Sequence, residues 1–129
     1  MIKSLSLLIA ITMLFFFFAM KIEAQTRIKF HGGSISAAVG GKLSGYRDKR
    51  TYVIKVRSAQ TLKTERIGNR YITIFVRDPN GEIVGDSDAS CNDRREIAPT
   101  ITGDYKIEVV ECRKADPWRG RFRFRVTVR

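Results

Sequence analysis

Apolar and polar residues alternate along several segments of this chain, and this alternation limits the possible folds more than any other feature. Residues 105–109 read YKIEV and residues 122–128 read FRFRVTV. A period of two places successive side chains on opposite faces of a β-strand, so each segment predicts a strand with one buried face. No segment shows the 3.6-residue period of an amphipathic helix.

Further strands are expected at 27–30, 51–56, 60–67, 71–76 and 95–101. The continuous apolar and β-branched run at 71–76 favours a central strand buried on both faces. Pro99 favours an edge position for its strand. The sequence DPNG at 78–81 indicates a turn between strands. Seven to eight short strands separated by turns predict an all-β fold, namely a compact antiparallel β-sandwich or jelly-roll-like domain.

The first 24 residues have the order of a secretory signal peptide. Lys3 gives a basic start, residues 5–20 (LSLLIAITMLFFFFAM) are apolar, and a more polar stretch ends at the small residue Ala24. This order predicts export and cleavage after Ala24, with no stable membrane insertion afterwards. An uncleaved anchor is the alternative, but the apolar run is shorter than the roughly 20 residues that span a bilayer.

The remaining residues, 25–129, are enough for one small domain. Removing the signal peptide takes away Lys3, Lys21 and Glu23 and lowers the formal net charge from +11 to +10. Such a charge favours anionic partners, among them nucleic acid, lipopolysaccharide, anionic cell-wall polymers or an acidic cleft of another protein.

Cys91 and Cys112 are the only cysteines. In an oxidising compartment an isolated pair predicts a disulfide, which would stabilise the domain by roughly 3 kcal/mol in the chain-entropy model. The alternatives are metal ligation and a nucleophilic thiol. Both are disfavoured, because His31 is the only histidine and no Cys-x-x-Cys motif is present.

Residues that could build a catalytic or metal centre are scarce. The chain has one histidine, no Gly-rich phosphate loop and no cluster with metal-ligand spacing. Residues 86–95 (DSDASCNDRR) are acidic enough to suggest a calcium loop. However, they depart from the EF-hand spacing and end in two arginines, which favours a solvated loop. We therefore expect a binding protein and not an enzyme, with no cofactor and no metal.

Arginines alternate with phenylalanines at 121–125. In a strand this alternation sends the phenylalanines to the core and the arginines to solvent. A platform for stacking bases needs its aromatic rings on the same exposed face as the basic groups. Nucleic acid is therefore not the expected partner.

Three pieces of the chain form an informative combination: residues 27–56 (RIKFHGGSISAAVGGKLSGYRDKRTYVIKV), residues 98–114 (APTITGDYKIEVVECRK) and the basic final strand. In order and spacing they resemble the periplasmic inhibitors of goose-type lysozyme of Gram-negative bacteria. The G-x-Y-x-I pattern after Thr102 is also similar to that of pre-peptidase C-terminal domains. The resemblance implies a periplasmic β-sandwich whose partner is a goose-type lysozyme, and whose loops block the substrate cleft of that enzyme.

The same resemblance assigns contact residues to two loops. The tyrosine of the family's Gly-Tyr element falls on Tyr46, and its first loop arginine falls on Arg113. A second loop arginine falls on Pro117, so the pattern is broken there and Arg119 is a displaced substitute. Trp118 either packs against the partner or caps the end of the sandwich. The alternative is a non-inhibitory basic β-sandwich that binds anionic envelope glycans or lipopolysaccharide through its arginines.

Overall fold

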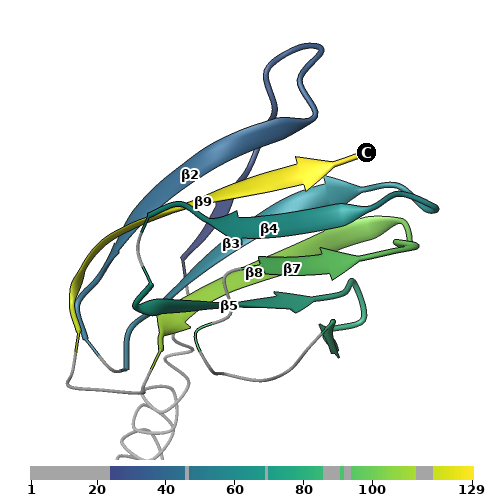
Figure 1. Cartoon of the computed structure of the whole chain (residues 1–129). Helices are drawn as coiled ribbons and strands as arrows, with labels where there is room; N and C mark the ends of the chain where they lie inside the picture. Colours follow the sequence, from purple (N-terminus) through teal and green to yellow (C-terminus); the bar gives the residue numbers. More distant parts are fainter. Residues whose placement is uncertain (1–23, 46, 69, 86–90, 92–93, 113–117) are drawn as a thin grey trace, which may run out of the picture.

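Nine β-strands in two facing sheets make up the described part of the chain (Figure 1). The structure is a computed structural model that describes residues 24–45, 47–68, 70–85, 91, 94–112 and 118–129. The strands are β1 (Gln25–Arg27), β2 (Ser36–Leu43), β3 (Lys49–Val56), β4 (Leu62–Arg66), β5 (Ile72–Arg77), β6 (Ile83–Val84), β7 (Arg94–Ile97), β8 (Gly103–Glu111) and β9 (Gly120–Val128). Within these residues, no helix is long and apolar enough to span a membrane.

One sheet has five strands in the order β1-β3-β8-β5-β6, and the other has four in the order β2-β9-β4-β7. Neighbouring strands are antiparallel, except that β1 runs parallel to β3. The predicted all-β antiparallel sandwich is therefore confirmed. The strand count exceeds the expected seven to eight because it includes β2, which the sequence analysis does not assign, and the two-residue β6.

The residues of the alternating segments lie on the faces of the sheets that the sequence predicts. In β9, Phe122, Phe124 and Val126 are buried between the sheets, while the arginines between them are exposed. Tyr52 of β3 meets Phe124 edge-on across the sandwich, with ring centroids 5.3 Å apart. Burying a side chain of this size contributes about 2–3 kcal/mol, so this aromatic layer is a main source of stability.

The segment rich in small residues forms β2, which the sequence analysis does not assign as a strand. Its small side chains fit a position close to the aromatic layer. A Cβ atom on Gly41 would overlap both the hydroxyl of Tyr52 and the ring of Phe122. The glycine therefore allows β2 to pair with β9 directly above these rings.

The position of the first strand is wrong in detail. The first strand was expected at 27–30, but the paired residues are Gln25–Arg27, and the Ile28 amide then donates to the Val53 carbonyl at 2.8 Å. The run expected as a central strand buried on both faces forms β5, which lies between β8 and the short β6, and its residues on both faces are mostly buried, so this prediction is confirmed. The prediction of an edge strand before Pro99 is confirmed, since β7 ends the four-stranded sheet.

Arg95 is buried, although the sequence favours a solvated loop at 86–95. Its side chain is 3% exposed, and its Nε donates to the Ile74 carbonyl at 2.6 Å. The guanidinium carbon lies 5.3 Å from the centroid of the Phe75 ring. A cation can be buried here because the carbonyl and the ring face replace water. Most of the acidic part of that segment lies outside the described residues.

Candidate functional site

The two loops that the resemblance assigns to lysozyme binding leave the sandwich at the same end. In the four-stranded sheet, Leu43 at the end of β2 pairs with Gly120 at the start of β9. In the five-stranded sheet, Lys49 at the start of β3 pairs with Val110 near the end of β8. The β2–β3 and β8–β9 connections therefore start and finish together, and we call this the loop end.

The described residues of the β2–β3 loop are held by Asp48. Its Oδ2 accepts hydrogen bonds from the amide and the hydroxyl of Ser44, each at 2.7 Å, and lies 3.4 Å from Nη2 of Arg50. Burial raises the pKa of Asp48, but the hydrogen bonds from Ser44 and the charge of Arg50 outweigh it and hold the pKa below its usual value. The carboxylate thus ties the two ends of the loop together at neutral pH.

The base of the β8–β9 loop is fixed by the predicted disulfide, which joins Cys91 to Cys112 with a Cα–Cα distance of 4.9 Å. The Cys112 amide also donates to the Tyr71 carbonyl at 2.8 Å, and the Cys91 amide donates to the Thr73 hydroxyl at 3.1 Å. Cys112 is buried. The bridge connects the end of β8 to the chain that precedes β7.

Trp118 caps the loop end. Its ring is stacked on that of Tyr71, with centroids 5.7 Å apart and an interplanar angle of 16°, and it packs half-buried against the core. Gly120 makes this position possible, because a Cβ atom there would lie 2.9 Å from the indole ring. Of the two roles weighed for this residue, the structure supports capping.

Of the predicted contact residues, Arg119 is described, and it is exposed at the loop end immediately before β9. Tyr46 and Arg113 lie outside the described residues, as does Pro117. The structure therefore brings together the chain on either side of these positions, and the roles of the residues themselves stay predictions. Within the described residues, no group of acidic, histidine or cysteine side chains could hold a metal ion.

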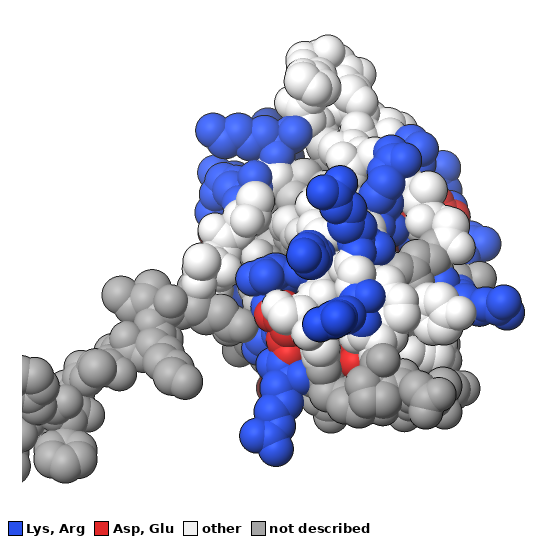
Figure 2. All heavy atoms as spheres, turned by 90° about the vertical axis from the view of Figure 1, so that its left-hand side faces the viewer, with Lys and Arg blue, Asp and Glu red and all other residues white. Residues whose placement is uncertain are grey.

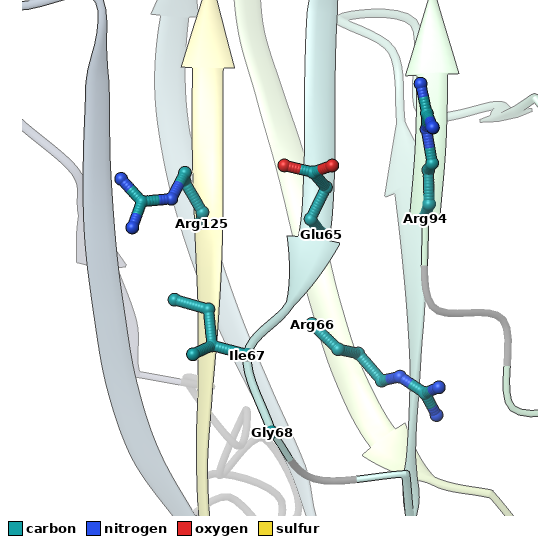
Figure 3. A pocket seen from close by; sticks show the side chains of 6 residues that line it. All are labelled: Glu65, Arg66, Ile67, Gly68, Arg94 and Arg125. Atoms are coloured by element: carbon teal, nitrogen blue, oxygen red, sulfur yellow. The ribbon is translucent and has the colours of Figure 1, made fainter.

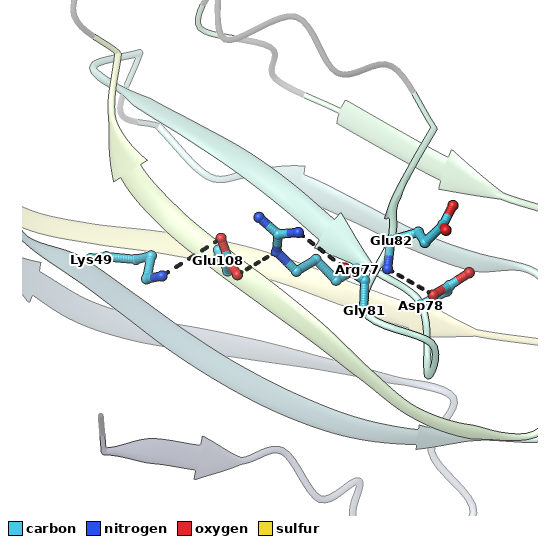
Figure 4. A network of polar contacts seen from close by, with 6 residues as sticks. All are labelled: Lys49, Arg77, Asp78, Gly81, Glu82 and Glu108. Atoms are coloured by element: carbon cyan, nitrogen blue, oxygen red, sulfur yellow. Dashed lines mark hydrogen bonds and ion pairs between the residues drawn. The ribbon is translucent and has the colours of Figure 1, made fainter. Parts of the chain in front are cut away.

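Two carboxylates on the outer face of the five-stranded sheet pair with neighbouring cations. Glu108 of β8 accepts a hydrogen bond from Nε of Arg77 at 2.8 Å and lies 3.9 Å from Nζ of Lys49, so it bridges both neighbouring strands (Figure 4). At the edge, both terminal nitrogens of Arg27 donate to Asp104, at 2.9 and 3.1 Å. The hydrogen bonds from Arg27 lower the pKa of Asp104.

A hollow of about 490 Å³ opens between β9, β4 and β7 on the four-stranded sheet. It is lined by Glu65, Arg66, Ile67, Gly68, Arg94 and Arg125 (Figure 3). The three arginine side chains point in different directions, so they do not converge on a small ligand. Nη1 of Arg66 is buried and has no hydrogen-bond partner among the described residues. The hollow is therefore a basic recess rather than a formed small-molecule site.

The sequence analysis missed the residues that hold the first loop. Ser44 and Asp48 flank the predicted contact residue Tyr46, and their spacing of four is a usable signal. Serine and aspartate commonly close short loops by bonding to nearby backbone groups. Arg50 adds a second tie, because its Nε donates to the Lys42 carbonyl at 2.8 Å.

Comparison with solved structures identifies several with the same fold. The PliG periplasmic inhibitor of g-type lysozyme from Aeromonas hydrophila superimposes with a TM-score of 0.65 at 20% identity, covering 81% of this chain and 96% of that one. PliG from Salmonella Typhimurium gives 0.61 at 17% identity, covering 83% and 99%. The pre-peptidase C-terminal domain of a Bacillus anthracis collagenase gives 0.53 at 16% identity, covering 84% and 98%.

No protein-family profile and no curated protein sequence matches the chain. The likeness is therefore one of fold, and it extends over most of this chain and nearly all of each solved structure. Both groups that the sequence resembles, the g-type lysozyme inhibitors and the pre-peptidase C-terminal domains, are among the structures with this fold.

Proposed function

We propose that this protein is a periplasmic inhibitor of goose-type lysozyme and has no enzymatic activity of its own. One observation supports the proposal most directly. The two loops that the sequence resemblance assigns to lysozyme binding start and finish at one end of a fold shared with PliG inhibitors. A single surface at the loop end could then enter the substrate cleft.

The chemistry of the predicted contacts suits such a cleft. Glycoside hydrolysis needs a carboxylic acid at the leaving oxygen and usually a second carboxylate. An arginine offers a planar, permanently charged group that pairs a carboxylate through two hydrogen bonds, which is the role proposed for Arg113 and Arg119. Tyr46 would add a rigid apolar body with one polar tip, as found in many interface anchors.

The surroundings of the loops favour tight binding. Asp48 and Arg50 restrain the chain next to Tyr46, and the disulfide with the Trp118 stack restrains the chain on either side of 113–117. Loops whose ends are already fixed lose less conformational entropy when they bind a partner.

A lysis assay tests the proposal. A goose-type lysozyme clears a peptidoglycan suspension while the purified protein is titrated in, with chicken-type and invertebrate-type lysozymes run in parallel. We expect saturable inhibition of the goose-type enzyme. Arg113→Ala and Tyr46→Ala should each weaken inhibition by at least tenfold, as truncation of a central interface residue does. No inhibition at micromolar protein would refute the proposal.

Arg57→Ala is the matched control for the arginine variant. Arg57 is exposed and follows Val56, which pairs with Gly103 at the opposite end of the sandwich. The control removes the same charge as Arg113→Ala but at the opposite end of the sandwich. It should therefore leave inhibition unchanged. Equal losses from Arg57→Ala and Arg113→Ala would show that net charge, and not the loop end, determines inhibition.

A further inference from the structure

The outer face of the four-stranded sheet has a row of arginines along its second strand. Arg121, Arg123 and Arg125 of β9 are all exposed and alternate with buried residues. Side chains two apart on a strand recur about every 6.7 Å on one face. The three guanidinium groups therefore form a regular cationic row.

The neighbouring strand β2 places small residues and one further cation beside this row. Ala38 pairs with Arg125, Gly40 with Arg123, and Lys42 with Arg121. The Arg123 Cγ lies 3.7 Å from the position that a Cβ atom of Gly40 would occupy. Because Gly40 has no side chain and Ala38 has only a methyl group, β2 does not block a ligand that approaches along β9. We call Lys42, Arg121, Arg123 and Arg125 the basic strip.

The described acidic residues of this face do not pair with Lys42, Arg123 or Arg125. Glu65 pairs with Lys63 on its own strand at 3.0 Å, and Glu96 lies 3.6 Å from Arg94 on its own strand. Although Glu65 is opposite Arg125 in the register, the Arg125 side chain points away from it toward β2 (Figure 3).

Lys42, Arg123 and Arg125 form no ion pair with any described residue. On the side of the molecule that faces the viewer in Figure 2, where β9 starts at the loop end, most of the charged side chains in view are basic. Lys42, Arg123 and Arg125 are thus available to pair with an anionic ligand.

We propose that the basic strip, which runs from the loop end along the outer face of the four-stranded sheet, is a second binding site for a linear anionic polysaccharide. An extended polymer can present an acidic group to each arginine in turn, and each guanidinium can pair with a carboxylate or a sulfate through two hydrogen bonds. The outward positions of this sheet include no aromatic residue among those described, so the stacking platform typical of single-stranded nucleic acid binding is missing.

The test compares two variants of equal charge. Arg123→Gln/Arg125→Gln removes two charges from the strip, and Lys55→Gln/Arg57→Gln removes two exposed charges at the far end of the five-stranded sheet. Binding of the purified protein to heparin, polygalacturonate and poly(dT) is measured by titration calorimetry at several salt concentrations. Circular dichroism confirms that each variant is folded.

We expect the strip variant to bind the polysaccharides about tenfold more weakly at 150 mM salt, and the control variant to change by less than twofold. A preference for heparin or polygalacturonate identifies the sulfate or carboxylate as the recognised group. Equal losses in both variants would refute the strip, because bulk charge would then explain binding. Poly(dT) binding that is as tight and equally dependent on the strip would refute the assignment to polysaccharide.

The strip and the loop end are tested independently. Because the strip variant leaves the loop end intact, it should inhibit goose-type lysozyme as well as the unmodified protein does. A protein that binds polysaccharide through the strip without inhibiting lysozyme would refute the proposed function and leave this inference standing.

Discussion

Removing the disulfide is the sharpest test of how the loop end is built. The bridge between Cys91 and Cys112 spans a sequence separation of 21. For a loop of this length, the chain-entropy relation gives about 11 cal/mol/K, or about 3.3 kcal/mol at 25 °C. A domain of this size has an unfolding entropy of about 220 cal/mol/K near 60 °C, so the melting temperature should fall by about 15 °C.

Thermal and urea unfolding of the oxidised protein and of Cys91→Ala/Cys112→Ala, followed by circular dichroism, measure this difference. Dithiothreitol provides the control: it should lower the melting temperature of the unmodified protein to near that of the variant, and leave the variant unchanged. A loss of less than about 1 kcal/mol would contradict the reasoning, since it would mean that the bridge barely restricts the unfolded chain.

Three further changes test the core and the first loop. Gly41→Ala should destabilise the protein by about 1–3 kcal/mol in urea unfolding, because the new methyl group overlaps Tyr52 and Phe122; no loss would mean that β2 moves freely. Phe124→Ala should cost about 3–5 kcal/mol in the same assay, since the ring is fully buried. The pKa of Asp48 is lowered in the folded protein, so its contribution to stability is complete above its unfolded value of about 3.9 and is lost as the pH falls through the lower folded value. Asp48→Asn should therefore flatten the decline of the melting temperature below pH 4, and an unchanged acid profile would refute this role.

The sequence predicts strands well where burial alternates. The β9 residues Phe122 and Phe124 face the core, and the arginines between them face solvent, because a period of two leaves one arrangement that buries the aromatics. The disulfide is equally predictable, since two cysteines in a chain that its sequence predicts to be exported allow one pairing. The resemblance to lysozyme inhibitors also leads to the right fold.

What the sequence could not predict depends on contacts between distant strands. β2 has small residues instead of an alternating pattern, and its position becomes understandable only when Gly41 is seen against Tyr52. The sequence favours a solvated position for Arg95 in a polar loop, yet the part of β5 that extends beyond its pairing with β6 provides the Ile74 carbonyl that lets it be buried. The contacts of Arg119 with a partner stay a prediction, because an exposed arginine looks the same with or without a binding role.

The position of β9 in its sheet has a consequence for how the chain reaches its folded state. β9 is the last of the described strands, yet it lies between β2 and β4 and pairs with both. A chain that emerges from a ribosome or a channel with its amino end first can therefore not assemble the four-stranded sheet until β9 has also emerged. Pairing strands so far apart in sequence makes folding slow. With the export that the first 24 residues predict, the chain should cross the membrane unfolded and gain its structure afterwards in one cooperative step.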